Sequence, residues 1–311
     1  MLEEFYGIAL RKKKNRNDVF WTNSLFEFDE IRFNISSRYW VADPFIVEDN
    51  DKVYVFYELY DYFKGKGVIA YSLVEQNRAS TPNIIIEEKV HLSFPFIWKD
   101  GENYYIMPES SGDSNLVVYV ASEFPVKWIK HSILLNDVKL CDSVRFDTLK
   151  RNETYIISSS MDTQKEYYWC DVTNKLYKDE NGKPRFIKDL SSGSIGIRNA
   201  GAILRLDDNL YRPGQVSDHN NYGHGLSIWR LTPDLSDDEC VYSFVSEEAI
   251  GHFNTESITA DKIVGIHTYN SSEKFEVVDF KYYRSFSFAE KIRNIIGGYF
   301  YRMISHSGLG G

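Results

Sequence analysis

Three acidic side chains, Asp43, Glu109 and Asp142, occupy recurring places in the sequence and could act together on a saccharide. Asp43 opens the segment DPFIVEDNDKVYVFYE, Asp142 opens the similar segment DSVRFDTLKRNETYIISSS, and Glu109 ends the segment PFIWKDGENYYIMPE. Cleavage or transfer of a glycosyl unit uses two carboxyl groups, of which one is ionised and the other is protonated. We therefore predict that Asp43, Asp142 and Glu109 are catalytic.

A plainer interpretation remains open for each of these acids. Asp43 and Asp142 could cap the turns that precede Pro44 and Ser143. Glu109 could simply accept hydrogen bonds from the two serines that follow it. In that case the pocket that these acids border would bind a glycan or a partner synthase, and no glycosidic bond would be cleaved.

Further polar and aromatic residues are predicted to contact the substrate. Arg212 and Gln215, in YRPGQ, replace an aromatic residue and a glutamate of the first repeat, so Arg212 could clamp a carboxylate or a phosphate, or pair with Asp43 or Glu109. Trp40 and Phe94 could offer their faces to a sugar ring or pack in the core. The remaining polar candidates are Arg198, Asn199, His252 and Asn254.

The candidates His252 and the loop at residues 219–224 each have an alternative. His252, in GHFN, could donate to a sugar hydroxyl, or it could be a structural histidine with satisfied hydrogen bonds. The loop HNNYGH could cover the site or be an ordinary polar turn.

The elements that would position these residues are five repeated hairpins. The first residues of the repeats, at intervals of 48 to 58 residues, are Asp43, Phe94, Asp142, Ala200 and Phe253. A period near fifty built from alternating apolar strands is typical of propeller blades. The sequence therefore predicts an all-β fold, a five-bladed β-propeller over residues 1–284. The blades are expected near residues 40–74, 91–135, 142–190, 197–244 and 251–280.

Two segments outside the hairpins complete the expected fold. Residues 5–10, FYGIAL, should pair with residues 275–280 and close the ring. The basic run at residues 11–16 should be a solvated loop, with a polyanion or membrane patch as the alternative. An insertion at residues 174–185 should form an exposed hairpin or loop.

Residues 285–311 are predicted to form a short amphipathic helix and a tail. Ser287 and Glu290 form a capping box, and apolar residues recur at intervals of three and four from Phe288 onwards. The pair Gly297-Gly298 should weaken the helix. We expect it to pack against the propeller or a partner protein, with peripheral contact to a membrane as the alternative.

Composition excludes several classes of function. The net charge of −9 argues against a nucleic-acid partner, which requires a basic surface. The three cysteines, Cys141, Cys170 and Cys240, have neither the number of a disulfide framework nor the spacing of a zinc site. We expect no metal, no cofactor, no transmembrane segment and no signal peptide, and hence a cytoplasmic protein.

The ADPF element, the repeat length and the position of Asp142 resemble the five-bladed propellers of glycoside hydrolase family 43. That resemblance implies that Asp43 is the general base and that Asp142 tunes the acid and holds the substrate. The acid of that family is a glutamate that opens blade four, where this sequence has Asn199-Ala200-Gly201. We therefore assign the acid to Glu109.

The stretches ADPF, HLSFPF, MPES, LYRPGQ and GHFN are similar to the propeller at the N-terminus of glucosamine inositolphosphorylceramide transferases, and to stand-alone bacterial proteins of surface-polysaccharide gene clusters. This likeness extends over nearly the whole chain. It implies the cleavage or transfer of a glycosyl unit in glycan assembly, on a saccharide that could carry an anionic group. The alternative is a non-catalytic glycan-binding or scaffolding module that partners a glycosyltransferase.

Overall fold

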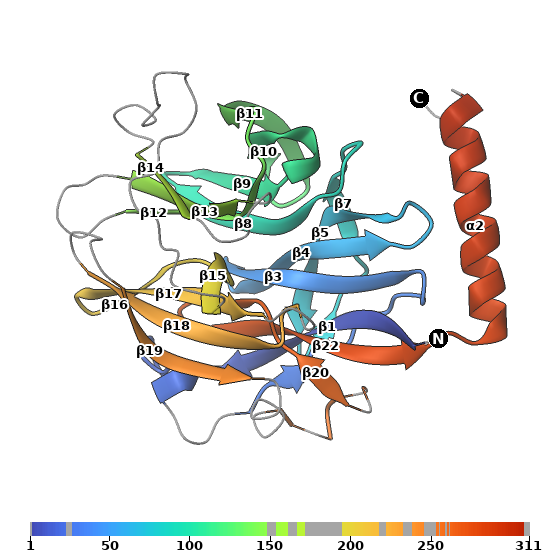
Figure 1. Cartoon of the computed structure of the whole chain (residues 1–311). Coiled ribbons are helices and arrows are strands. Elements are labelled where there is room, and N and C mark those ends of the chain that lie inside the picture. Colours follow the sequence, from blue (N-terminus) through green and yellow to red (C-terminus); the bar gives the residue numbers. More distant parts are fainter. Residues whose placement is uncertain are drawn as a thin grey trace.

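The fold is an all-β propeller that is followed by one helix, α2 (Figure 1). The computed structural model describes residues 2–22, 27–147, 154–160, 167–171, 195–217, 222–232, 238–245, 253–254, 256–258, 260 and 262–307. Hydrogen bonds join the strands of this part of the chain into five sheets. The insertion at residues 174–185 lies outside the described residues.

The strands follow one another along the chain in nearly every sheet. The first sheet contains β3 (Tyr39–Asp49), β4 (Lys52–Asp61), β5 (Lys66–Glu75), β6 (Arg78–Ala79) and β7 (Asn83–Ile86). The second contains β8 (Ser93–Asp100), β9 (Asn103–Glu109), β10 (Asn115–Glu123) and β11 (Lys127–Asn136), and the third contains β12 (Leu140–Asp147), β13 (Thr154–Ser160) and β14 (Tyr167–Asp171). The fourth contains β15 (Ile195–Asn199), β16 (Leu204–Leu206), β17 (Asn209–Val216), β18 (Gly225–Leu231) and β19 (Asp238–Val245). The fifth contains β1 (Leu2–Lys12), β2 (Asp29–Glu30), β20 (Ile263–Gly265), β21 (Tyr269–Ser271) and β22 (Phe275–Ser285).

Successive residues of β4, the second strand of the first sheet, pack against different neighbouring sheets. On β4, Phe56 lies in a core cluster with Phe94 of the second sheet. Tyr57, the next residue, lies in another cluster with Ile8 of the fifth sheet. A sheet buried on both faces needs apolar residues on both faces, which explains the nearly continuous apolar run of β4.

The first three sheets share a bulge at the first residue of the repeat. Asp43, Phe94 and Asp142 have positive φ angles of 53°, 44° and 50°. In each sheet the pairing of the first two strands shifts at this residue, so that two residues stand opposite one. Such bulges redirect a side chain. The three repeat positions therefore have one backbone conformation, although two carry an aspartate and one a phenylalanine.

The fifth repeat differs from the expectation. Phe253 forms only an isolated parallel bridge with Phe28, and the strands that pair with β22 on its inner side begin at Ile263. The segment after Ile263 lies beside β22 because Asp279 accepts hydrogen bonds from the backbone nitrogens of His267 and Thr268. The inner strand of the fifth repeat therefore begins at Ile263, about ten residues later than the sequence pattern indicates.

The N-terminal strand closes the ring of sheets. β1 pairs with β22 along its whole length, with Phe5 opposite Tyr282 and Leu10 opposite Val277. The basic run that follows is not a solvated loop throughout, because Arg11 and Lys13 are buried. Arg11 pairs with Glu276 at 2.5 Å, so part of this run ties the closing strand to the fifth sheet.

The C-terminal helix α2 (Phe288–Ser307) is longer than expected and continues through its two glycines. Its start has the predicted capping box, since the backbone nitrogen of Ser287 donates to Glu290 at 2.9 Å and the backbone nitrogen of Glu290 donates to Ser287 Oγ at 3.3 Å. The helix contacts the propeller, as expected, through Gly297 beside Phe63, but its large apolar side chains are mostly exposed. Among the described residues, no helix has the length and hydropathy that a membrane crossing requires.

Candidate functional site

Asp43 lies in the inner strand of the first sheet and is fixed by three neighbours. Its Oδ2 accepts a hydrogen bond from the backbone nitrogen of Phe94 at 3.1 Å, and its Oδ1 accepts one from Thr268 Oγ1 at 2.8 Å. The Nε2 atom of His267 lies 3.3 Å from Oδ1. These contacts come from the second and fifth sheets, so Asp43 sits where sheets meet.

His267 lies between two carboxylates, Asp43 and Asp279. Its Nδ1 is 2.8 Å from Asp279 Oδ2, and Asp279 also accepts the backbone N–H of Asp43 at 3.1 Å. Burial lowers the pKa of His267, but the charge of Asp279, the hydrogen bond to Asp279 and the charge of Asp43 together outweigh burial and raise that pKa above its usual value. The imidazole therefore bridges the first and fifth sheets in surroundings that favour its protonated form.

A second pair of acids, Glu109 and Asp142, joins the second and third sheets. Glu109 Oε2 accepts the backbone N–H of Asp142 at 3.2 Å. Arg198 of β15 binds both acids. Its Nε atom is 2.5 Å from Asp142 Oδ2, and its Nη2 atom is 3.5 Å from Glu109 Oε2. Gln215 Nε2 donates to the same Asp142 oxygen at 3.2 Å. The structure thus brings the two predicted acids together with two predicted binding residues.

Glu109 and Asp43 have pKa values that are raised to different extents by burial and by their charged neighbours. Burial raises the pKa of Glu109 to about 8, with the charge of Asp142 adding to the rise and Arg198 opposing it. Burial raises the pKa of Asp43 to about 6; His267 opposes that rise and Asp279 adds to it. At neutral pH this arrangement favours a protonated Glu109 and an ionised Asp43.

Glu58, which follows Asp43 by one hairpin, is a further acid in the same electrostatic environment. It is buried, and burial together with the charges of Asp43 and Glu109 raises its pKa well above the usual value. We refer to Asp43, Glu58, Glu109, Asp142, Arg198, His267 and Asp279 as the axial cluster. Its five carboxyl groups face two cationic side chains, so electrostatics favours protonation of some of the acids.

Two tyrosines border the axial cluster. The ring of Tyr222 lies 5.0 Å from the guanidinium carbon of Arg198 and 5.5 Å from the ring of His267, and this side chain is 39% exposed. The ring of Tyr6, on β1, lies 4.9 Å from the ring of His267. Tyr222 belongs to the loop at residues 219–224 that was predicted to cover the site, and residues 219–221 of this loop lie outside the described part.

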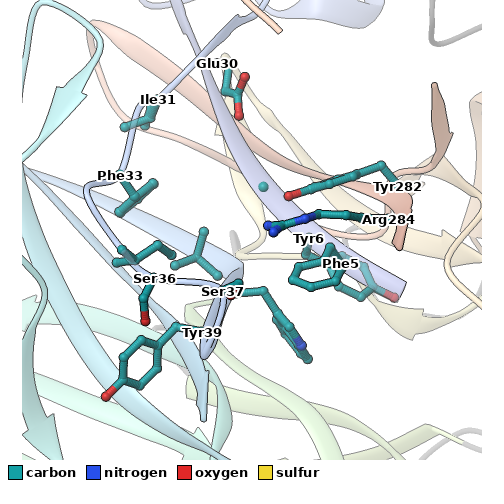
Figure 2. Close-up of a pocket in the computed structure, with 14 residues that line it drawn as sticks. Phe5, Tyr6, Glu30, Ile31, Phe33, Ser36, Ser37, Tyr39, Tyr282 and Arg284 are labelled. Carbon is teal, nitrogen blue, oxygen red and sulfur yellow. The ribbon is translucent and has the colours of Figure 1, made fainter. Parts of the chain in front are cut away.

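Trp40 lies beside the axial cluster, in the wall of a separate cavity. Its ring stacks on Tyr60 at 4.6 Å and lies 5.2 Å from Tyr6. The cavity measures about 240 Å³ and is lined by β1, β22 and the segment before β3. Figure 2 shows Arg284 and Tyr282 on one side of this hollow and Ser36, Ser37 and Tyr39 on the other.

The other predicted contacts have different surroundings. The Phe94 ring is fully buried and packs edge-on to Phe45 at 5.0 Å, so its predicted role as a sugar platform is wrong and core packing is correct. Asn199 donates to the backbone oxygen of Asp142 at 2.7 Å and thus positions that residue. Arg212 is buried, with its guanidinium carbon 5.8 Å from the ring of Trp229.

Asn254 lies away from the axial cluster. Asn254 donates to Asp29 at 2.8 Å, on β2 at the outer edge of the fifth sheet. Its predicted contact with substrate is therefore replaced by a turn-stabilising role, because its side chain also accepts the backbone N–H of Glu256. His252 lies outside the described residues.

The sequence analysis missed His267 and Asp279. With Phe253 as the first residue of the fifth repeat, Thr268 follows it by fifteen residues, as Glu58 follows Asp43, so the pattern assigns no role to His267. Asp279 stands in the apolar strand FEVVDFKYY, where an acid with no exposed surface is unusual and could have been the signal.

Two groups of side chains have atoms of the type that bind metal ions. They are Asp43 with His267 and Asp279, and Glu109 with Cys141 and Asp142. In both groups the carboxylate oxygens already accept hydrogen bonds or ion pairs from the chain. The negative charge is thus partly compensated by protein groups.

Sequence comparison finds relatives over most of the chain. Residues 15–251 match the family described as glucosamine inositolphosphorylceramide transferase 1, N-terminal. Glucosamine inositolphosphorylceramide transferase 1 of Oryza sativa subsp. japonica is 27% identical over 202 residues, and that of Arabidopsis thaliana is 29% identical over 202 residues. These alignments cover 61% of this chain but 26% and 25% of the relatives, so the chain matches about a quarter of their length.

Structural comparison finds the same fold in proteins of low sequence identity. The catalytic domain of a family 62 α-L-arabinofuranosidase from Coprinopsis cinerea has a TM-score of 0.54 at 11% identity, covering 88% of this chain and 97% of that chain. A hypothetical protein from Leishmania major has a TM-score of 0.54 at 10% identity, covering 83% and 91%. These likenesses concern the fold.

Proposed function

We propose that this chain, which belongs to the family of glucosamine inositolphosphorylceramide transferase 1 N-terminal domains, handles a saccharide at the axial cluster during glycan assembly. One observation carries the proposal. Glu109 and Asp43 are two buried carboxyl groups whose surroundings raise their pKa values to different extents, to about 8 and about 6. A pair of acids tuned apart in this way is suited to glycosyl cleavage or transfer.

The proposed roles follow from the contacts. Glu109, protonated at neutral pH, donates its proton to the leaving oxygen of the glycosidic bond. Asp43, held by Thr268 and the Phe94 backbone, activates the water or the acceptor hydroxyl. Asp142, paired with Arg198, keeps a negative charge next to Glu109 and so favours its protonated form.

The choice of a saccharide is supported by relatives rather than by a bound ligand. The curated relatives are named as transferases of glucosamine to an inositolphosphorylceramide, and one fold neighbour is an arabinofuranosidase. Because this chain matches only a quarter of each transferase, the activity of the whole relatives is part of the proposal.

The roles also assume that each of the five sheets is one blade of a five-bladed ring. The shared bulge at Asp43, Phe94 and Asp142 supports this assumption, as does the pairing of β1 with β22. In such a ring the inner strands converge, which accounts for contacts between side chains as distant in sequence as Asp43 and Thr268.

A second candidate function is a non-catalytic glycan-binding module, which would partner a glycosyltransferase. The observation that favours it is the ion pairing of Arg198 with Asp142 and Glu109, which are only 2% and 6% exposed. Acids buried against an arginine can serve structure alone.

Product analysis separates the two candidates. The full chain would be screened against an array of glycans and glycolipids, and the best binder would be incubated with it and analysed by mass spectrometry. We expect a cleaved or transferred product, and a loss of roughly 100-fold or more in rate for Asp43→Asn and Glu109→Gln, because each removes an acid or base from the reacting centre.

Asp61→Asn is the matched control, since it neutralises a buried acid on β4 that pairs with Arg38 and lies outside the axial cluster. It should keep most of the activity. Binding without any product by the wild-type protein would establish the binding module instead, and absence of binding to every glycan would contradict both candidates.

A further inference from the structure

Helix α2 exposes an apolar surface that nothing in the described chain covers. Its exposed apolar residues, between 41% and 80% accessible, are Phe288, Ile292, Ile295, Ile296, Tyr299, Phe300 and Met303. Soluble proteins rarely expose several neighbouring large apolar side chains without a partner. We call these seven residues the apolar arc.

The apolar arc is continuous and is flanked by basic side chains. At 3.6 residues per turn, its members span roughly 140° of the helix circumference. On the same projection Arg293 falls just beyond one edge, and Lys291 and Arg302 fall just beyond the other. Long basic side chains in such places can keep their charges in a polar layer while the stem of each lies along apolar surface.

The opposite side of α2 holds the helix to the propeller. A Cβ atom on Gly297 would lie 2.2 Å from the ring of Phe63, so the glycine permits this close approach. Glu290 bonds Arg284, and Lys64 lies 5.8 Å from the ring of Tyr301. In Figure 1 α2 stands at one edge of the molecule, beside the sheets. The helix is therefore attached by its small-residue side, with the apolar arc facing outward.

We propose that α2 binds the surface of an anionic lipid bilayer, lying in the interface with the apolar arc inserted among the headgroups. Charge complementarity selects this occupant. The chain has a net charge of −9, yet α2 contains three basic residues and one acid, and that acid is paired with Arg284. Basic residues that border an apolar helical face are typical of helices that lie on anionic membranes.

A second copy of the chain is a poorer occupant of the apolar arc. Pairing of two identical arcs would place Lys291, Arg293 and Arg302 of one copy close to the same residues of the other. It would also bring together two chains that each carry a net charge of −9. An anionic bilayer meets the basic flanks with the opposite charge.

Vesicle flotation with the full chain tests this proposal. Vesicles of phosphatidylcholine mixed with phosphatidylserine should carry the protein upward, whereas vesicles of phosphatidylcholine alone should carry much less. Ile295→Glu should reduce the bound fraction by roughly tenfold or more, since it removes the burial of one large apolar side chain and adds a repelled charge. A double variant, Lys291→Gln with Arg302→Gln, should weaken binding most at low salt.

Ile129→Glu is the matched control, because Ile129 is a similarly exposed isoleucine on β11, away from α2. It should bind vesicles like the wild type. Circular dichroism would verify that each variant keeps its fold. Equal loss for Ile129→Glu and Ile295→Glu, absence of flotation by the wild type, or a dimer that Ile295→Glu dissociates without any vesicle binding would each overturn the proposal.

Discussion

At the scale of single residues, the axial cluster depends on how burial and charge divide protons among five acids. Asp43 and Glu109 each accept hydrogen bonds from a backbone N–H and a hydroxyl, so these bonds do not distinguish the two acids. Glu109 has Asp142 next to it, and burial adds to that repulsion, so its protonated form is favoured. The two acids therefore differ mainly in their charged neighbours: His267 opposes the rise in the pKa of Asp43, whereas Asp142 adds to the rise in the pKa of Glu109.

The raised pKa of Glu109 predicts a pH dependence of stability. In the unfolded chain the pKa of this acid is near its ordinary value of 4.5, whereas in the folded protein burial and Asp142 raise that pKa to about 8. The folded state thus binds more protons in this window, so the free energy of unfolding should fall as pH rises from about 5 to about 8.

Glu109→Gln cannot ionise and should flatten that fall, by an amount on the order of 1 kcal/mol or more across the window. Urea unfolding at a series of pH values measures it. Glu102→Gln, at the exposed tip of the same hairpin, should leave the wild-type slope unchanged. A Glu109→Gln protein with the full wild-type slope would show that this acid is not protonated in the folded state.

At the scale of elements, the repeated bulge could be predicted from local sequence, whereas the role of a glycine in α2 could not. Asp43 and Asp142 could be predicted as equivalent because an ungapped pattern surrounds both, and the structure gives them the same backbone conformation. The contact of Gly297 with Phe63 could not be predicted, since glycine in a helical pattern signals only a lower propensity. Its reason is a ring from a distant hairpin.

The close approach of α2 predicts opposite effects for its two glycines. Gly297→Ala should displace the helix, because the new methyl group would meet the Phe63 ring, whereas at Gly298 the nearest atom would be at an ordinary 3.6 Å. Gly298→Ala should therefore stabilise α2 by up to about 1 kcal/mol through helix propensity.

Hydrogen exchange of the α2 amides measures both effects. Protection should decrease in Gly297→Ala and increase in Gly298→Ala, and Phe63→Ala should restore part of the protection to Gly297→Ala by removing the clash. Identical protection in the two glycine variants would mean that α2 does not rest on Phe63.

At the scale of the whole molecule, the repeat could be predicted from the sequence, but the strands of the fifth sheet could be predicted only in part. The spacing of hairpins predicted a propeller, and the pairing of residues 5–10 with residues 275–280 is present in the structure. The start of the fifth repeat was misplaced because the pairing of β20 and β21 with β22 depends on Asp279, a buried side chain outside the repeat pattern. The same pairing places His267 beside Asp43 in the axial cluster.

The central proposal is a saccharide site where the sheets meet, at the axial cluster. The most direct measurement is a crystal structure of the protein with the saccharide that binds it best in the array, using Glu109→Gln to prevent turnover. We expect a sugar ring next to Tyr222, with hydroxyl or glycosidic oxygens within hydrogen-bond distance of Asp43 and of the substituted side chain at position 109. A sugar bound instead in the cavity beside Tyr39 and Trp40, with an unchanged and sealed axial cluster, would contradict it.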